Sequence, residues 1–499
     1  MRAVFVLFAG LVLATRAVFS IWQVWFCWSL KNLTFDINIA APQKNKKGNF
    51  MTEKLINRPL YMDAIKKYLN TPEIKVLIGV RRCGKSSLLA LLAKQLKKQK
   101  IPKQNIVHIR LDSYDVPLNA DVEWLNSELH VALENTSSNQ PSYVLLDEVQ
   151  EIDGWERVVR KLNARSDTYV FITGSNSRVL SGDLATFLAG RYIEIPVYPL
   201  NFHEYELFAK EMKWTDTNRA TNREKIRKRN YEENRESNYE TNYVAIREHL
   251  FDDFMTYGGM PGLFYHEQGD ATAFQNVLSS IVDTVVLKDV IARHAIKDAE
   301  LLNRVIKYVF LTSGNLLSTK KIVDTLNSAG RKSSQETIDN YIKALQSSKV
   351  LSVCEQSGIS GKEILRAKRK YYVADMGLRN MTIGFNRTRD TGFQFEGLIY
   401  NELKTRAWDI ATARNKKDEE IDFVAGRGGE KMYVQVSLTV LDDKTFEREV
   451  RPLERVRDAF PKYVVVRDQN RTGVTEKGVR IINVFDFLNL LDSDATNYG

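Results

Sequence analysis

One short run limits what this chain can fold into more than any other feature. Residues 79–86 read GVRRCGKS, which matches the pattern G-x-x-x-x-G-K-[S/T]. A strand-forming run, 75–78, precedes it and a helix-forming run, 86–96, follows it. In that setting the glycines let successive backbone amides point inward, and the helix N-terminus adds partial positive charge. The run therefore predicts a phosphate-binding loop between a buried strand and a helix.

Each residue type in this loop suits a nucleoside triphosphate bound with a metal ion. We expect the Lys85 ammonium to span the β- and γ-phosphates and the Ser86 hydroxyl to ligate Mg²⁺. The predicted cofactors are therefore ATP and Mg²⁺. The residues predicted to contact the nucleotide through this loop are Gly79, Val80, Arg81, Arg82, Cys83, Gly84, Lys85, Ser86 and Ser87.

A second strand pattern supplies the acids that such a site needs. The run YVLLDE ends in Asp147 and Glu148, at the carboxyl end of a strand, where open α/β sheets bind ligands. We expect Asp147 to hold Mg²⁺ through water and Glu148 to act as general base on the attacking water. Without a phosphate loop in the same chain, Asp147 and Glu148 would be interpreted as two surface acids at the end of a strand. The phosphate loop upstream favours the catalytic interpretation, and Ser175 or Asn176, after the next strand, is the candidate γ-phosphate sensor.

The chain around this site divides into segments of different character. Short β-rich and helical runs alternate across residues 51–210, which predicts one nucleotide-binding domain with a parallel sheet. Residues 211–243 form a low-complexity insertion rich in Asn, Arg and Glu, with too few apolar side chains to bury a core. We expect a solvated insertion or a marginal helix there. The five strand patterns lie at 74–78, 105–111, 143–146, 169–172 and 192–197.

Three more regions are expected after the insertion. Residues 244–300 predict a helical lid or linker with a sharp corner at YGGMP. Residues 301–380 predict three helices and then a β-hairpin, a winged-helix-like order in which Ser318 and Ser334 are N-caps. Residues 390–491 predict a small α/β domain.

Taken together, the motifs resemble those of a known family. The resemblance is to prokaryotic AAA-type ATP-binding proteins with a C-terminal domain of unknown function, and it spans about residues 51–491 apart from the insertion. It implies an α/β fold with a P-loop AAA-type parallel sheet, a winged helix, and a C-terminal domain similar to the restriction-endonuclease-like nuclease fold. It also implies ATP binding and slow hydrolysis. The motifs are Arg58–Tyr61, GVRRCGKS, YVLLDEVQEIDGWERVVRKL, FITGSNSRVLSGDLATFLAGRYIEI, YPLNFHEY, YGGMP, KYYVADMGLRN and EIDFV.

The resemblance also assigns a role to Arg191, which directly precedes the fifth strand pattern. AAA-type domains carry an arginine there that is aimed at a neighbouring subunit's γ-phosphate, so Arg191 is a candidate catalytic residue. The alternative is that Arg191 only solvates the start of the strand, and the sequence leaves both interpretations open.

The implied nuclease-like domain lacks part of its expected chemistry. That fold holds Mg²⁺ with a helix Glu, a strand Asp and an acid-x-Lys pair. Glu396 and Asp422 match the first two, but Gln435 and Ser437 stand where the acid and the lysine are expected. A neutral amide is a poor Mg²⁺ ligand, and a hydroxyl carries no positive charge. We therefore expect a binding or structural role for this domain and no nuclease activity.

Three functions stay open. The first is a regulatory AAA-type ATPase whose nucleotide state repositions the winged-helix and C-terminal domains. The second is a module that binds double-stranded DNA through residues 318–349, with an accessory ATPase, although acidic side chains dilute the basic ones. The third, a small-molecule kinase, is disfavoured because Asp147 and Glu148 suit water activation. Self-association or a protein partner is also open. The basic residues are Lys320, Lys321, Arg331, Lys332 and Lys343, and the acidic ones Asp324, Glu336 and Asp339.

The first fifty residues form an apolar extension that allows three interpretations. Two apolar runs flank Arg16, and the segment could be a signal, a membrane anchor, or a stretch upstream of a true start at Met51. Membrane contact is expected only if residues 1–30 are genuine. These fifty residues hold half of the chain's formal net charge of +10, so overall charge does not indicate a polyanion partner. Three scattered cysteines exclude a disulfide framework and favour a cytoplasmic location.

Overall fold

The structure is a computed structural model, and it describes residues 54–137, 139–174, 190–214, 237–291, 294, 296–358, 369–385, 391–414, 419–468 and 470–496. Residues 56–499 form one unit, separate from residues 1–55. The predictions for residues 1–50 therefore lie outside the described residues. None of the helices among the described residues is long and apolar enough to cross a membrane.

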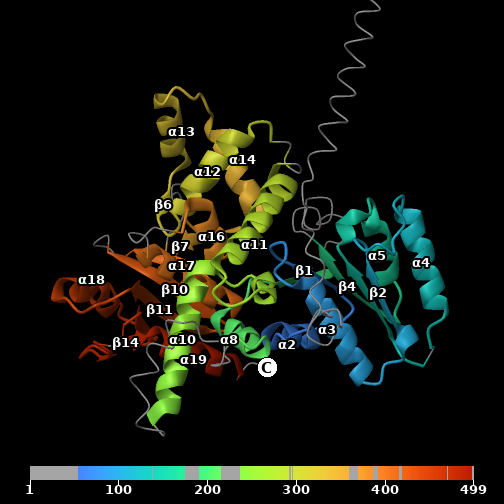
Figure 1. The fold of residues 1–499 in the computed structure, drawn as a ribbon, viewed down its shortest axis with the longest axis horizontal. Coiled ribbons are helices and arrows are strands. Elements are labelled where there is room, and N and C mark those ends of the chain that lie inside the picture. Colours follow the sequence, from blue (N-terminus) through green and yellow to red (C-terminus); the bar gives the residue numbers. More distant parts are fainter. Residues whose placement is uncertain are drawn as a thin grey trace, which may run out of the picture. The chain divides into compact units, whose positions relative to one another are not determined.

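The first sheet has five parallel strands in the order β2-β3-β4-β1-β5 (Figure 1). The central strands β1 and β3 are buried along their whole length because helices cover both faces of the sheet. Each strand matches a predicted strand pattern to within about two residues. The strands are β1 (Ile74–Ile78), β2 (Ile106–Arg110), β3 (Ser142–Asp147), β4 (Thr168–Gly174) and β5 (Tyr192–Pro196).

Among the described residues, four helices cover this sheet, two on each face. Leu77 and Leu145 point to one face and pack in the same core as α2 (Pro59–Lys67) and α3 (Lys85–Lys98). Residues of the opposite parity, such as Val76 and Val144, pack with α4 (Val122–Glu134) and α5 (Trp155–Asn163). This alternation is the period-2 pattern of a strand, and it fixes the register of the sheet.

A helical segment follows the first sheet. It consists of α8 (Phe202–Glu211), α10 (Ser237–Tyr257), the 3-10 helix η4 (Pro261–Tyr265), α11 (Ala271–Thr284) and the π-helix η5 (Val285–Ile291). The corner predicted at YGGMP is confirmed, since α10 ends at Tyr257 and η4 begins at Pro261. The last part of the predicted insertion, 237–243, forms the first turns of α10, while residues 215–236 lie outside the described part.

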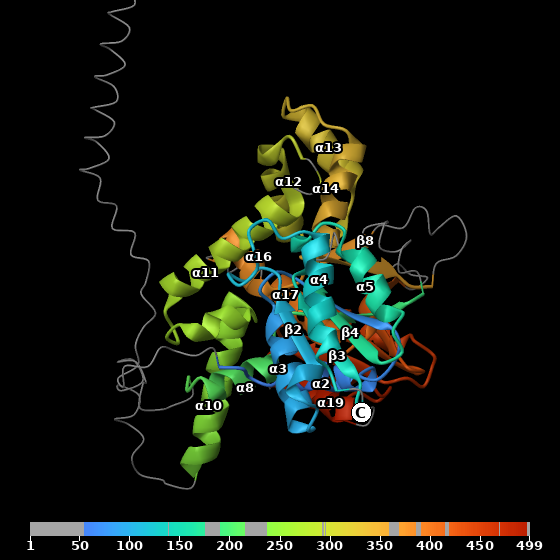
Figure 2. The same cartoon turned by 90° about the vertical axis from the view of Figure 1, so that its right-hand side faces the viewer.

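Three further helices pack together in both views (Figures 1 and 2). They are α12 (Ala299–Leu311), α13 (Thr319–Ser328) and α14 (Gln335–Ser347), with the short strand β6 (Leu316–Leu317) after α12. The Ser318 side chain accepts a hydrogen bond from the Lys321 amide, and the Ser334 side chain accepts one from the Thr337 amide. Both predicted N-caps are therefore confirmed.

The second sheet has nine strands in the order β13-β14-β12-β11-β10-β9-β7-β8-β6. Residues 301–380, with the hairpin β7–β8, and residues 390–491 were predicted to be separate regions. In the structure β7 pairs with β9, so both regions share one sheet. The strands are β7 (Leu351–Gln356), β8 (Arg369–Val373), β9 (Asp409–Arg414), β10 (Glu420–Arg427), β11 (Glu430–Ser437), β12 (Lys462–Val466), β13 (Gly473–Val474) and β14 (Arg480–Asn483); the helices are α16 (Met376–Ile383), α17 (Thr391–Thr405), α18 (Asp443–Glu454) and α19 (Val484–Thr496).

Candidate nucleotide-binding site

Two glycines shape the loop between β1 and α3. A Cβ atom at Gly79 would lie 1.9 Å from the carbonyl oxygen of Val197, so this position has no room for a side chain. Gly84 caps α3 with φ 101°, a left-handed conformation that favours glycine. The N-terminus of α3 therefore begins directly at the loop, which is the arrangement that binds an anion.

Lys85 is buried within this loop and bonded to its backbone. Lys85 is only 3% exposed, and its ammonium donates to the carbonyl oxygens of Gly79 at 3.0 Å and Val80 at 3.1 Å. Among the ion pairs of the described residues, none involves Lys85. Among the described residues, two backbone carbonyl dipoles stabilise its charge, so a phosphate can compete for it.

Asp147 lies at the carboxyl end of β3 and is fully buried. Its Oδ1 accepts a hydrogen bond from the Thr173 hydroxyl. Its Oδ2 accepts none from the described residues and lies 3.8 Å from Arg110 Nε. Burial raises the pKa of Asp147, and the hydroxyls of Thr173 and Ser86 partly offset that rise. A buried carboxylate oxygen without a donor fits a cation, so Asp147 and Ser86 suit Mg²⁺.

Glu148 follows in a left-handed backbone conformation, with φ 55°. Its N–H donates to Thr173 Oγ1 at 3.0 Å, and its carboxylate accepts from the side-chain amide of Gln150. One buried threonine on β4 thus contacts both Asp147, the last residue of β3, and Glu148, which follows it. Sequence reasoning missed Thr173 and placed its polar candidates two and three residues later. The strand register, which pairs Leu146 with Ile172, would have indicated it.

The two loop arginines contact the helical segment. Arg81 Nε lies 2.8 Å from both carboxylate oxygens of Asp289 in η5, and Arg82 Nη1 donates to Ser280 Oγ in α11 at 3.1 Å. The loop pattern predicts nucleotide contacts for both arginines, whereas here their charged groups join the loop to α11 and η5. Cys83 is buried, and burial raises the pKa of its thiol.

The remaining predicted residues are separated from the loop or lie outside the described residues. Ser175 and Asn176 belong to the latter group. Arg191 is exposed, and its carbonyl oxygen accepts from the Ile74 amide at 2.9 Å. Ile74 is the first residue of β1, whereas the phosphate loop follows the last residue of β1. Arg191 therefore lies at the amino ends of the strands, opposite the edge that carries the loop. Any action of Arg191 on a γ-phosphate would therefore require a neighbouring subunit.

Comparisons with known proteins agree with this geometry. Residues 71–206 match the family described as "AAA domain", and residues 248–389 match the family described as "Domain of unknown function (DUF8612)". An uncharacterized protein of Haemophilus influenzae is 30% identical over 439 residues, which cover 88% of this chain and 100% of the relative. The chain belongs to the same family as this relative, and it contains an AAA domain. An uncharacterized protein of Methanocaldococcus jannaschii is 28% identical over 408 residues, or 81% of each chain.

Two solved structures are similar to this AAA-type chain at low identity. A Walker-type ATPase of Pyrococcus abyssi has a TM-score of 0.41 and 15% identity, and the match covers 68% of this chain and 98% of the other. An AMPPCP-bound DnaA from Aquifex aeolicus has a TM-score of 0.26 and 13% identity, covering 62% and 94%. The AAA domain of this chain, with its loop and acids at one sheet edge, supports ATP binding.

The C-terminal part of this AAA-type protein contains a second group of acids, which we call the acidic cluster (Glu396, Glu420 and Asp422). Lys370 of β8 lies among them: its Nζ is 3.0 Å from Glu396 Oε1, 2.5 Å from Glu420 Oε1 and 3.8 Å from Asp422 Oδ1. The Tyr372 hydroxyl also donates to Glu396 Oε1 at 2.6 Å. Sequence reasoning looked for this lysine at position 437 and missed it on β8.

One ammonium, that of Lys370, lies among the three acids of this cluster. Burial lowers the pKa of Lys370, but the carboxylates, Glu396 foremost, outweigh this and leave the pKa above its ordinary value. Burial and the charge of Glu396 raise the pKa of Asp422. Gln435, which stands where a metal-ligating acid was expected, donates to Glu449 Oε2 at 2.8 Å. Within the described residues, no group of three or more acids, histidines or cysteines is arranged to hold a metal ion.

Proposed function

We propose that this protein binds Mg-ATP at residues 79–87 and hydrolyses it slowly, and that nucleotide state repositions the winged-helix-like region and the C-terminal domain. The observation that carries the proposal is the presence of two residues with room for a ligand: among the described residues, Lys85 bonds only to carbonyl oxygens, and Asp147 Oδ2 lacks a hydrogen-bond donor. Both lie at one sheet edge. Together they offer a positive charge for phosphate and a ligand for its metal.

Each residue then has a distinct task. Lys85 neutralises charge on the β- and γ-phosphates, and Asp147 with Ser86 would hold Mg²⁺, which when bound neutralises phosphate charge further. Glu148 takes a proton from water, and the hydrogen bond from Gln150 orients its carboxylate. Thr173 keeps the two acids in register because it donates to one and accepts from the backbone of the other.

The test of ATP binding uses the full chain and a fluorescent ATP analogue. We expect Lys85→Ala to weaken binding about 10- to 100-fold, as for a lost charge-assisted contact. Lys94→Ala is the matched control, since Lys94 is exposed on the same helix. Unchanged affinity in Lys85→Ala would refute the site. A phosphorylated small-molecule product, in place of free phosphate, would favour the kinase alternative.

One of the basic residues on which the DNA-binding alternative depends, Arg331, is already paired with acidic side chains. Arg331 Nη2 lies 3.0 Å from Asp298 Oδ1 and its Nη1 lies 2.9 Å from Glu300 Oε1. A guanidinium paired with two carboxylates is less available to a phosphate backbone. We therefore keep the nucleotide switch as the proposed function.

A further inference from the structure

Arg58 is a buried arginine beside the phosphate loop that the reaction itself does not use. It is 2% exposed and stacks on the Tyr61 ring, with its guanidinium carbon 4.2 Å from the ring centroid. Its Nη1 donates to the Cys83 carbonyl oxygen at 2.9 Å, and its Nη2 donates to the Tyr198 carbonyl oxygen at 2.9 Å. Nε and Nη2 also donate to the two carboxylate oxygens of Glu204, at 2.9 and 2.7 Å. One planar group therefore joins two separate segments, the phosphate loop and the stretch 198–204.

The first of these segments is the phosphate loop. The Cys83 carbonyl belongs to the peptide that ends at Gly84, the N-cap of α3. A Cβ atom on Gly84 would lie 3.6 Å from Arg58 Nη1, so the guanidinium lies against this peptide. Because amides of this loop bind phosphate, the orientation of that peptide affects nucleotide binding. Arg58 thus bears directly on the geometry of the loop.

The second segment leads away from the AAA sheet. Glu204 and Asn201 form a capping box at the start of α8, with hydrogen bonds of 2.8 and 3.3 Å. The Phe202 amide, one of the free donors of that first turn, donates to Glu402 Oε1 of α17 at 2.8 Å. Glu402 in turn pairs with Arg406, and both side chains are no more than 1% exposed. A continuous buried polar path therefore runs from the phosphate loop to α17.

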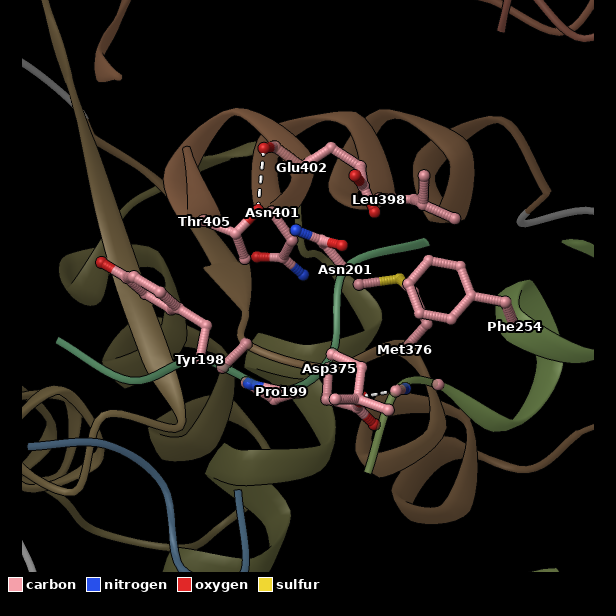
Figure 3. A pocket seen from close by; sticks show the side chains of 14 residues that line it. Tyr198, Pro199, Asn201, Phe254, Asp375, Met376, Leu398, Asn401, Glu402 and Thr405 are labelled. Carbon is pink, nitrogen blue, oxygen red and sulfur yellow. Dashed lines mark hydrogen bonds between the residues drawn. The ribbon is translucent and has the colours of Figure 1, made fainter. Parts of the chain in front are cut away.

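Figure 3 shows where this path crosses into α17: Asn401, Glu402 and Thr405 of that helix lie opposite the segment that carries Tyr198, Pro199 and Asn201. A cavity with about 20 Å³ of space, enough for one water molecule, lies between them. Asn201 lines it, and its buried Nδ2 has no hydrogen-bond partner among the described residues. The contact thus leaves one polar atom without a partner beside a small, mostly apolar cavity, so it is not fully packed.

We propose that Arg58 is a positioning residue that sets the phosphate loop and transmits its state through Glu204 and Phe202 to Glu402 of α17. This inference rests on the proposed function, because it names the route by which nucleotide state would reach the C-terminal region. A coupling route between two sites is established only when a change in the route alters the behaviour of both sites. The experiment therefore reads both ends separately.

The experiment measures amide hydrogen exchange in α17 of the full chain, with and without the β,γ-imido analogue of ATP, alongside the affinity for that analogue. In the wild type we expect the analogue to slow exchange at residues 398–406 by about fivefold or more, the lower end of typical coupling between sites. Glu402→Leu should bind the analogue with unchanged affinity and lose this response. Glu402→Gln, which keeps an acceptor for the Phe202 amide, should retain part of it.

Arg58→Lys tests the other end. A lysine keeps the charge but cannot bridge Cys83, Tyr198 and Glu204 at once, so we expect affinity to fall about tenfold and the α17 response to vanish. Arg165→Lys is the control, since Arg165 pairs with Asp167 on the exposed surface. A wild-type α17 response in Glu402→Leu would overturn the inference, whether or not Arg58→Lys folds. Wild-type protein that binds nucleotide without any α17 response refutes this route alone, and wild-type protein that binds none refutes the proposed function as well.

Discussion

The phosphate loop and the acidic cluster each bring a buried lysine close to carboxylates, but the two lysines have opposite partners. Lys85 donates to two backbone carbonyl oxygens. Lys370 forms ion pairs with Glu396, Glu420 and Asp422. Lys85 can exchange weak neutral partners for a phosphate, whereas Lys370 would have to give up three carboxylates. The loop therefore has a charge available to a ligand, and the acidic cluster has none.

The acids of the two regions differ in the same way. Asp147 Oδ2 accepts no hydrogen bond from the described residues, so a cation would complete its bonding. Glu396 Oε1 already accepts from Lys370 and from Tyr372. The ammonium of Lys370 stands where a metal ion would have to stand. Residue types alone thus do not tell whether a lysine and acids form a binding site, because the partners already present decide it.

The largest expected difference between the phosphate-loop site and the acidic cluster is in the rate of ATP turnover. Glu148→Gln should lower the rate of phosphate release by about 10²-fold or more, because an amide cannot take a proton from water. ATP affinity should stay within about threefold of wild type, since Lys85 and Asp147 are untouched. Steady-state phosphate release and equilibrium binding of the fluorescent analogue check the two parts.

The matched change in the acidic cluster is Asp422→Asn. We expect it to leave nucleotide turnover unchanged, and we expect the wild-type protein with Mg²⁺ to leave duplex DNA uncut. Turnover in Glu148→Gln equal to wild type would remove the general-base role. DNA cleavage by the wild type that stops in Asp422→Asn would show that the acidic cluster is the more active region.

The second expected effect is on stability, and it concerns the two lysines. Lys370→Met should lower the free energy of unfolding by about 3–5 kcal/mol, because it leaves buried carboxylates without a counter-ion. Lys85→Met loses hydrogen bonds to neutral carbonyls only and should cost about 1 kcal/mol. Urea unfolding at neutral pH measures both.

The pH dependence of the stability loss in Lys370→Met gives a second test of the contrast between the two lysines. Burial already raises the pKa of Asp422, and without Lys370 this acid can take up a proton instead, so the cost of Lys370→Met should shrink as the pH falls toward 5. Equal losses for Lys85→Met and Lys370→Met, or a Lys370→Met cost that does not change with pH, would contradict the contrast between the two sites.

The sequence predicted the loop region well because its signals are local. Glycines, an unbroken apolar run and a helix start occur within a few residues of Lys85, and each apolar strand pattern stands between polar turns. All five strands of the first sheet follow from these signals. The caps Ser318 and Ser334 were predictable for the same reason, since a capping side chain bonds within its own first turn.

The acidic cluster was not predictable in the same way, because its decisive residue comes from another region. Lys370 reaches Asp422 only because β7 pairs with β9 and extends one sheet across both regions. No local pattern encodes that pairing. Arg58 and Glu402 illustrate the same limit, since their bonding partners lie 146 and 200 residues away in sequence.

The third expected effect concerns another buried carboxylate, that of Asp375, which accepts hydrogen bonds from backbone amides. Its Oδ2 accepts from the Gly259 amide at 2.7 Å and its Oδ1 from the Leu378 amide at 2.9 Å. Burial nevertheless raises the pKa of Asp375 from 3.8 to about 6. Between these two values the native state binds a proton that the unfolded chain has lost. The free energy of unfolding should therefore fall, by up to about 3 kcal/mol, as the pH rises from about 4 to 6, and stay level above.

Asp375→Asn isolates this contribution, since the amide does not titrate. The stability of the wild type relative to Asp375→Asn should be higher at pH 4.5 than at pH 7.5, by about 2 kcal/mol, in urea unfolding. A difference that stays constant over this range would mean that Asp375 is ionised throughout. The three carboxylates then represent three ways to hold a buried acid: Asp147 is suited to a metal ion, Asp422 has an ammonium, and Asp375 takes up a proton. Only the first leaves a place for a ligand.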